Sequence, residues 1–431
     1  MSITAIFYVL IFLYCLFKAF ASRPIWGLWA YFFAFYLHPH SKYWGSQLPT
    51  LRWSLIAAIV TLLVLFVKKK QDEKFVFFEF VENKIFFLFV IFVAIQYFWA
   101  LSGTVHMVYV VMTAKFLLLI FLIQNCLKTN KDILLFILIN LVGSAYVSYI
   151  GISQHSGGRF EGVGGPGLSE TNEIAQHLGV VLIMSAYLLL CRLGKKSYLL
   201  IIPILLLLQA IMMTESRGAM IALAGAAFFS LIYSPKKVRK QFILFAVLGG
   251  IAFSALVGPQ LLSRFDKMSS NDDGELKGQS ANSRFVMMDI QWGIFKEQPI
   301  LGHGHKGTLI LSPIYVPEKY LTREGVRASH NLVMSMLVDH GAIGSILYFS
   351  VTLCCLLKAR AACKTAGDED DIHLLRTLLL GIGISLIYLM LGGLGSNNKV
   401  MEVDIWLYAL IPLLFSRLKN IKTIESINEK S

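Results

Sequence analysis

Long apolar segments recur along almost the whole 431-residue chain, and this recurrence constrains its fold more than any other feature. A helix of about 20 apolar residues is long enough to cross the roughly 30 Å of bilayer hydrocarbon. Hydrophobic residues make up 56% of the chain and charged residues only 15%. Most soluble classes are therefore excluded, and the sequence predicts an all-α polytopic membrane protein.

The apolar runs give the expected number of spans. We expect about 12 or 13 transmembrane helices from their lengths. They lie near residues 3–21, 25–37, 51–67, 85–101, 105–124, 132–152, 173–191, 198–213, 217–233, 241–258, 330–357, 372–391 and 400–416.

Lysine and arginine are distributed unevenly between the loops. If the spans alternate in direction, the basic clusters fall on one side, as in KKKQDEK (68–74), SPKKVRK (234–240) and SRLKNIK (416–422). Cytoplasmic loops of membrane proteins carry the positive excess, so this side is expected to be cytoplasmic and the other periplasmic. The basic cytoplasmic loops then account for the net charge of +13, and no nucleic-acid partner is needed to explain it. All six cysteines fall toward the cytoplasmic side, which predicts free thiols.

Loop lengths divide the chain into three expected parts. These are an N-terminal transmembrane bundle (1–258), a large periplasmic loop (259–328) and C-terminal transmembrane helices (329–431). A loop of this size is usually functional.

The large loop is expected to contain both mobile and helical segments. The polar composition of 269–283 predicts a mobile segment, and the prolines of 312–320 predict a loop. Between them, an amphipathic helix that Asn282 or Ser283 begins is expected to lie in the membrane interface. Its apolar face would carry Phe285, Met288, Trp292 and Phe295.

Three arginines and a histidine are expected to lie together on the periplasmic face. They are Arg159, Arg217, Arg284 and His330. A guanidinium donates two parallel hydrogen bonds to phosphate oxygens and stays charged, so this set favours a diphosphate ligand. Each arginine alone is equally consistent with an interface anchor whose side chain extends toward water.

His330 precedes an apolar span. Ser329 is expected to cap that helix, and the helix dipole disfavours a positive imidazolium at this end. A neutral imidazole can accept a proton from a hydroxyl as a general base. The alternative interpretation is a histidine that caps or packs at the interface.

Other polar residues are weaker candidates. DEDD (368–371) falls on the cytoplasmic side and is interpreted as a solvated charge run. His303 and His305 are possible metal ligands, but no carboxylate or cysteine accompanies them at ligand spacing, so they are interpreted as residues of a glycine-rich turn. Lys115 and Asp339 are charges inside spans, which are either functional or paired with other buried groups.

Three stretches resemble the O-antigen ligase family, whose superfamily also includes O-antigen polymerases and protein O-oligosaccharyltransferases. SRGA (216–219) opens a span, and SRFVMMDIQWGIFKEQPILGHG (283–304) resembles an arginine-led helix ending in P-(I/L)-L-G-x-G. SHNLVMSMLVDHGAIG (329–344) is similar to H-(N/S)-x-x-L…E-x-G-x-x-G. Their order along the chain also matches the family. The N-terminal YFFAFYLHPHSKYWG (31–45) resembles the O-glycosylation ligases associated with exosortase systems.

The resemblance implies roles for individual residues. Arg217 and Arg284 would hold the diphosphate of an undecaprenyl-linked glycan, and His330 would activate the acceptor hydroxyl. GRFEGVGGPGLSETNEIAQ (158–176) resembles the family stretch R-x-x-G…N-x-x-A, which adds Arg159 and Asn172 as secondary candidates. Asp339, also secondary, stands where the family usually has glutamate, and Thr171 stands where proline or asparagine is expected. The resemblance implies no metal and no other cofactor.

We therefore predict an enzyme of the inner membrane that transfers a preassembled glycan from undecaprenyl diphosphate to lipid A core on the periplasmic face. An O-antigen polymerase or a protein O-oligosaccharyltransferase with the same donor are open alternatives. A non-enzymatic lipid-glycan transporter is the rival from another class. It would have charged residues along a path through several spans, and a close pair of Lys115 and Asp339 would favour it.

Overall fold

The computed structural model describes residues 2–69, 74–154, 160, 162, 164–165, 167–191, 193–234, 239–240, 243, 274–365, 367, 369–397, 399 and 401–428. Most of these residues lie in helices, and none of them lies in a strand. Seven of the described helices are long and apolar enough to cross a membrane, and two shorter ones are also apolar. The protein is an all-α polytopic membrane protein.

Wherever the structure describes a predicted span, a helix occupies it. Of the expected span 241–258, the structure describes only Ile243. The helices are α1 Ile3–Ala21, α2 Ile25–Leu37, α3 Trp53–Val67, α4 Val81–Gln96, α5 Gly103–Cys126, α6 Asn130–Gln154, α7 Thr171–Leu190, α8 Ile201–Met213, α9 Arg217–Tyr233, α11 Gly274–Glu297, α12 Gly307–Tyr315, α13 Leu332–Cys363, α14 Asp370–Gly393 and α15 Glu402–Asn428. Short 3₁₀ turns cover Pro39–Ser41, Tyr43–Gln47, Phe77–Glu79, Lys195–Leu200 and Glu318–Tyr320.

Short polar residues begin several of these helices. Ser2, Ser102, Ser216 and Asn331 each accept a hydrogen bond from a backbone amide in the first turn. Such caps satisfy amides that have no partner within the helix. In hydrocarbon every backbone group must be satisfied internally, so apolar runs that start at a cap fold as helices.

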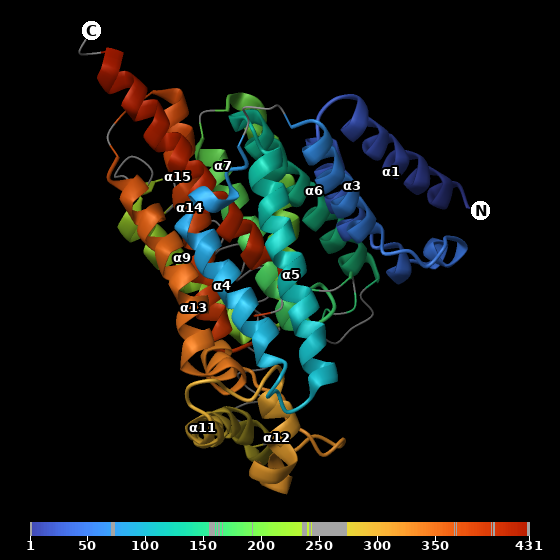
Figure 1. The fold of residues 1–431 in the computed structure, drawn as a ribbon, viewed down its shortest axis with the longest axis vertical. Helices are drawn as coiled ribbons and strands as arrows, with labels where there is room; N and C mark the ends of the chain where they lie inside the picture. The colour runs from blue at the N-terminus through green and yellow to red at the C-terminus, as the bar shows by residue number, and fades with distance from the viewer. Residues whose placement is uncertain are drawn as a thin grey trace.

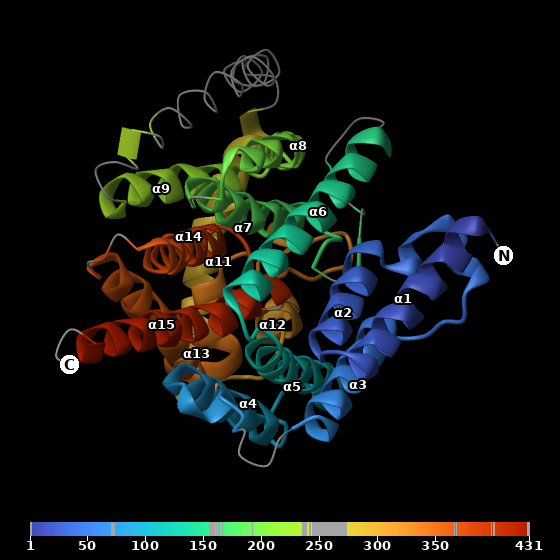
Figure 2. The ribbon, with the colours of Figure 1, turned by 90° about the horizontal axis from the view of Figure 1, so that it is seen from above.

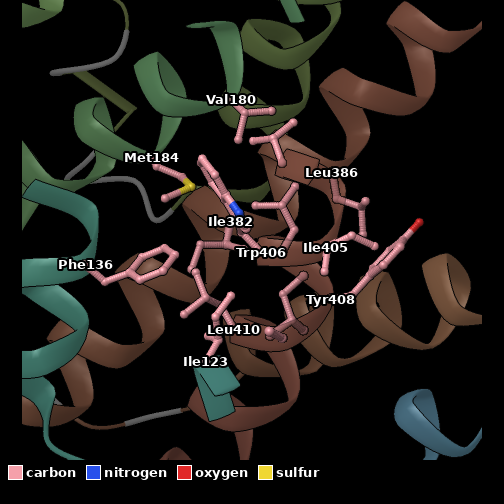
Figure 3. Packing of buried hydrophobic residues seen from close by; sticks show 14 of the residues in the cluster. Ile123, Phe136, Val180, Met184, Ile382, Leu386, Ile405, Trp406, Tyr408 and Leu410 are labelled. Carbon is pink, nitrogen blue, oxygen red and sulfur yellow. The ribbon is translucent and has the colours of Figure 1, made fainter. Parts of the chain in front are cut away.

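The C-terminal helices pack among the N-terminal ones. α14 lies against α7 and α9, α13 against α4, and α15 against α5, as the two ribbon views show (Figures 1 and 2). Trp406 on α15 is fully buried at the centre of this packing, with the ring of Phe136 6.1 Å away. Figure 3 shows Met184 of α7 and Ile382 of α14 beside the same indole.

The two ends of the bundle differ. At one end Arg23, after α1, pairs with Asp132 of α6 at 2.7 Å, and Lys358 of α13 pairs with Glu82 of α4 at 2.6 Å. This end gathers loops that are expected from the sequence to be cytoplasmic, and we call it the basic end. α11 and α12 cover the opposite end (Figure 1), which we call the α11–α12 end.

Two local predictions for the large loop are wrong. α11 begins at Gly274, inside the segment expected to be mobile, so Asn282 and Ser283 lie within the helix and do not begin it. Glu275, Leu276, Lys277 and Gln279 are good helix formers, and in this segment they outweigh the polar composition.

The segment 312–320 is not all loop either, because α12 extends to Tyr315 with Pro313 inside it. Proline cannot donate to the carbonyl four residues earlier. Here the hydroxyl of Ser312 donates to that carbonyl, the oxygen of Leu309, at 2.7 Å. The helix therefore tolerates the proline.

Candidate functional site

His330 lies at the α11–α12 end, two residues before α13, and its side chain is partly exposed. Asn331 begins α13, and its Nδ2 donates to the carbonyl oxygen of Leu394 at 3.1 Å. The prediction that Ser329 caps this helix is wrong, because Ser329 Oγ accepts a hydrogen bond from Gln291 Nε2 of α11 at 2.7 Å. The residues on either side of His330 therefore attach it to α11 and to the loop after α14.

Three charged side chains affect the titration of His330. Loss of water around the ring lowers the pKa of His330 below its ordinary value, and the positive charges of Arg327 and Arg284 lower it further. The carboxylate of Glu170, at the start of α7, acts in the opposite direction and raises it. The net effect favours a neutral imidazole at neutral pH, which is the form that a general base requires.

Arg284 reaches the loop between α14 and α15. A Cβ atom added to Gly395 would lie 3.7 Å from Arg284 Nη1 and 3.8 Å from the Cα atom of Gly218. Gly218 is the second residue of α9 and follows Arg217, whose side chain is exposed. The guanidinium of Arg284 and the first turn of α9 thus meet at Gly395, next to the Leu394 carbonyl that anchors Asn331.

The start of α9 is held by a side-chain pair. Ser216 Oγ accepts a hydrogen bond from the Ala219 amide at 3.4 Å and donates to Asn172 Oδ1 of α7 at 2.7 Å. The amides of Arg217 and Gly218 precede the first helical hydrogen bond and carry the positive end of the helix dipole. Together with the guanidinium of Arg284, such a helix end can bind an anion.

Of two further candidates, the structure leaves one undescribed and places the other apart from this group. Arg159 lies outside the described residues. Asp339 lies inside α13 and is almost fully buried; its Oδ1 accepts from the Gly307 amide and its Oδ2 from the Lys306 amide, both at 2.9 Å. Asp339 thus caps α12, and it forms an ion pair with Lys399.

The two glycine-rich stretches interlock beside Asp339. α13 is broken at Gly341, where φ is 61° and ψ is −166°. The turn after α11 enters the break: Ala342 N donates to Pro299 O at 2.8 Å, and His303 N donates to Val338 O at 2.9 Å. This contact connects α11, which carries Arg284, to the helix that follows His330.

The remaining histidine candidates are core residues. His303 and His305 are buried, and the His305 ring stacks on Tyr109 with centroids 4.4 Å apart. His303 Nε2 lies 3.0 Å from the carbonyl oxygen of Ile294. Within the part of the chain that the structure describes, no cluster of three His, Cys, Asp or Glu side chains is placed to hold a metal.

The pairing that would favour transport does not occur. The Lys115 side chain is exposed on α5, whereas Asp339 pairs with Lys399. A cavity of about 10 Å³ lies beside Lys399, with Tyr109 and Asp404 in its lining. This space holds no more than one water molecule.

Sequence reasoning missed Glu170, Arg327 and Lys399. Glu170 lies two residues before Asn172, and Arg327 lies three residues before His330. Their closeness to these candidates in the sequence could have identified them. Lys399 lies directly before the last apolar run and resembles an ordinary interface lysine in the sequence.

Comparison with known proteins identifies the region that contains the central residues. The sequence model of the O-antigen ligase family matches residues 202–349, which include Arg217, Arg284 and His330. Asn172 and Lys399 lie outside the matched segment. No curated protein matches the chain.

Proposed function

We propose that the chain, whose residues 202–349 match the model of the O-antigen ligase family, moves a preassembled glycan from undecaprenyl diphosphate to an acceptor hydroxyl. The proposed acceptor is lipid A core, on the periplasmic side of the inner membrane. One observation carries the proposal: Arg284, the first turn of α9 and the residue after His330 all meet at Leu394 and Gly395.

The arginines act on the leaving group. Arg217, Arg284 and the free amides of α9 bind the diphosphate of the donor. As the bond between the anomeric carbon and the diphosphate oxygen breaks, negative charge grows on that oxygen. Preorganised donors aimed at this charge stabilise the transition state. Arg159 is a further proposed ligand of the same diphosphate, and Asn172 holds the start of α9 through Ser216.

His330 acts on the acceptor. The acceptor hydroxyl attacks the anomeric carbon, and the neutral imidazole of His330 takes its proton. The new glycosidic bond forms as undecaprenyl diphosphate leaves, with inversion at the anomeric carbon in a direct displacement. This scheme requires no metal ion.

α11 suits a donor anchored in the membrane. Phe285 and Trp292 are exposed by 71% and 42% on this helix, whereas Gln291 and Ile294 are buried against the protein. An exposed apolar face beside a basic residue is typical of a helix in the membrane interface. Arg284 would therefore lie at the depth of the phosphates of a lipid-linked donor.

The test uses purified protein in nanodiscs with an undecaprenyl-diphosphate glycan, lipid A core and a chelator. The wild type is expected to form glycosylated core. Arg217→Ala and Arg284→Ala should each lower turnover about 10²- to 10³-fold, and His330→Ala by about 10²- to 10⁴-fold. Arg323→Ala is the control, because Arg323 is an exposed arginine in the loop before His330 and should leave turnover unchanged.

The products separate the alternatives. A lengthened donor glycan would indicate a polymerase, and transfer to a protein hydroxyl would indicate protein glycosylation with the same site. An intact donor with every acceptor class would contradict the proposal. Unimpaired turnover of His330→Ala would remove the assignment of the base.

A further inference from the structure

Lys399 is a buried cation in the loop after α14. Its side chain is 1% exposed and forms an ion pair with Asp339, which is 3% exposed. The ammonium also lies 5.3 Å from the centre of the Tyr109 ring. An unpaired ammonium in such a place costs several kcal/mol, so the position of Lys399 is tied to that of Asp339.

Asp339 is itself fixed on two sides. It belongs to α13, and its two carboxylate oxygens accept the Lys306 and Gly307 amides at the start of α12. A carboxylate held by two backbone amides has little freedom to follow a moving partner. Lys399 is therefore anchored to a rigid junction of α12 and α13.

The same loop touches the proposed reaction site at its other end. Leu394 O accepts the hydrogen bond from Asn331, next to His330. Gly395 lies between the Arg284 guanidinium and the first turn of α9. The loop therefore connects the buried ion pair to the place where the diphosphate is proposed to bind.

We propose that Lys399 is a positioning residue, whose ion pair with Asp339 holds the loop after α14 so that Arg284, α9 and His330 keep their relative places. This inference rests on the proposed function. In this proposal, Lys399 does not contact the substrate. Without the ion pair, Gly395 loses its fixed position and the arginines are no longer aligned with the breaking bond.

The test compares Lys399→Gln with Lys358→Gln. Both substitutions break a lysine pair with a buried carboxylate of the bundle, but Lys358 and its partner Glu82 lie at the basic end. Misalignment of about 1 Å can cost 10²-fold in rate. Lys399→Gln is therefore expected to lower kcat about 10²-fold with a small change in the KM for donor, whereas Lys358→Gln keeps the wild-type kcat.

Hydrogen–deuterium exchange supplies a readout that does not depend on transfer. Lys399→Gln should raise exchange in peptides covering 327–336 and 393–401, and Lys358→Gln should not. If the wild type transfers no glycan, the proposed function fails, but the exchange result still decides whether Lys399 holds the loop. Wild-type exchange and kcat in Lys399→Gln would overturn the inference, as would an equal loss of kcat in both variants.

A second variant covers the case in which Lys399→Gln does not assemble. The double variant Lys399→Gln with Asp339→Asn leaves no unpaired charge in the core, and such replacements are often tolerated. A lowered kcat with raised exchange in 393–401 supports the positioning role, because the amide contact that Asp339→Asn gives up lies at the start of α12 and acts on the peptides around 306 and 307. A wild-type kcat in the double variant overturns it.

Discussion

Replacing Gly341 with alanine is expected to separate α11 from α13. The backbone at Gly341 has φ of 61° and ψ of −166°, a region that glycine alone populates readily. An added Cβ atom would lie 2.4 Å from the carbonyl oxygen of Ile300 and 2.7 Å from the Gly302 amide nitrogen. Both neighbours are backbone atoms, so no side chain can rotate to make room.

The cost has two parts. Holding alanine in this conformation costs about 1–3 kcal/mol. Relieving the clash moves the turn away and breaks the hydrogen bonds from Ala342 N to Pro299 O (2.8 Å) and from Ile343 N to Ile300 O (3.2 Å), each worth about 1 kcal/mol. The expected loss in free energy of unfolding is therefore about 3–5 kcal/mol.

Thermal unfolding of the purified protein and glycan transfer measure the two consequences. Gly341→Ala should unfold at a lower temperature than wild type, and its turnover should fall because the turn no longer places α11 and Arg284. Gly293→Ala is the matched control. Gly293 lies within α11 and has nothing within 4 Å of an added Cβ, so alanine should leave stability unchanged or raise it by up to about 1 kcal/mol.

A wild-type unfolding temperature and wild-type turnover in Gly341→Ala would refute this reasoning. Lower stability with unchanged turnover would refute only the expectation that the turn places α11 and Arg284. The turn would then stabilise the bundle without placing Arg284.

Two further predictions concern the titration of His330 and the start of α9. Since the pKa of His330 lies below its ordinary value, kcat/KM should stay constant at neutral pH and fall as the pH drops through that lowered pKa, because the base becomes protonated. Arg327→Gln should move this acid limb to higher pH and Glu170→Gln to lower pH; shifts in the same direction would contradict the assignment. Asn172→Ala removes the acceptor of the Ser216 hydroxyl, a loss of about 1 kcal/mol, so turnover should fall several-fold, far less than in the arginine variants. A loss as large as that of Arg284→Ala would mean that Asn172 contacts the donor.

The spans could be predicted from the sequence because the bilayer imposes a length and a hydrophobicity on each of them. The basic clusters further predicted which helix ends lie together, and the pairs Arg23–Asp132 and Lys358–Glu82 join ends on one side. Helix starts were less predictable. Ser329 and Asn331 are both good caps, and the choice between them depends on Gln291, which engages Ser329 from another helix.

The site was predictable only in part. The resemblance pointed to Arg217, Arg284 and His330, but no local pattern shows that the loop after α14 lies between them. The same limit applies to the buried charges. Lys115 lies inside an apolar run and Lys399 directly before one, and only the packing decides that Lys399 is buried and pairs with Asp339.

The buried polar groups under the site explain how a site exposed to water can stay rigid. Gln96 Nε2 donates to the carbonyl oxygens of Leu301 and Asp339 at 2.6 and 2.8 Å, and its Oε1 accepts from His340 Nδ1 at 2.7 Å. Because unsatisfied polar groups are costly inside the bundle, this network has few alternative arrangements. Gln96→Leu should therefore lower both stability and turnover, whereas Arg284→Ala, at the exposed edge, should lower turnover and leave the unfolding temperature unchanged. An equal loss of stability in both variants would show that the arginine also stabilises the fold.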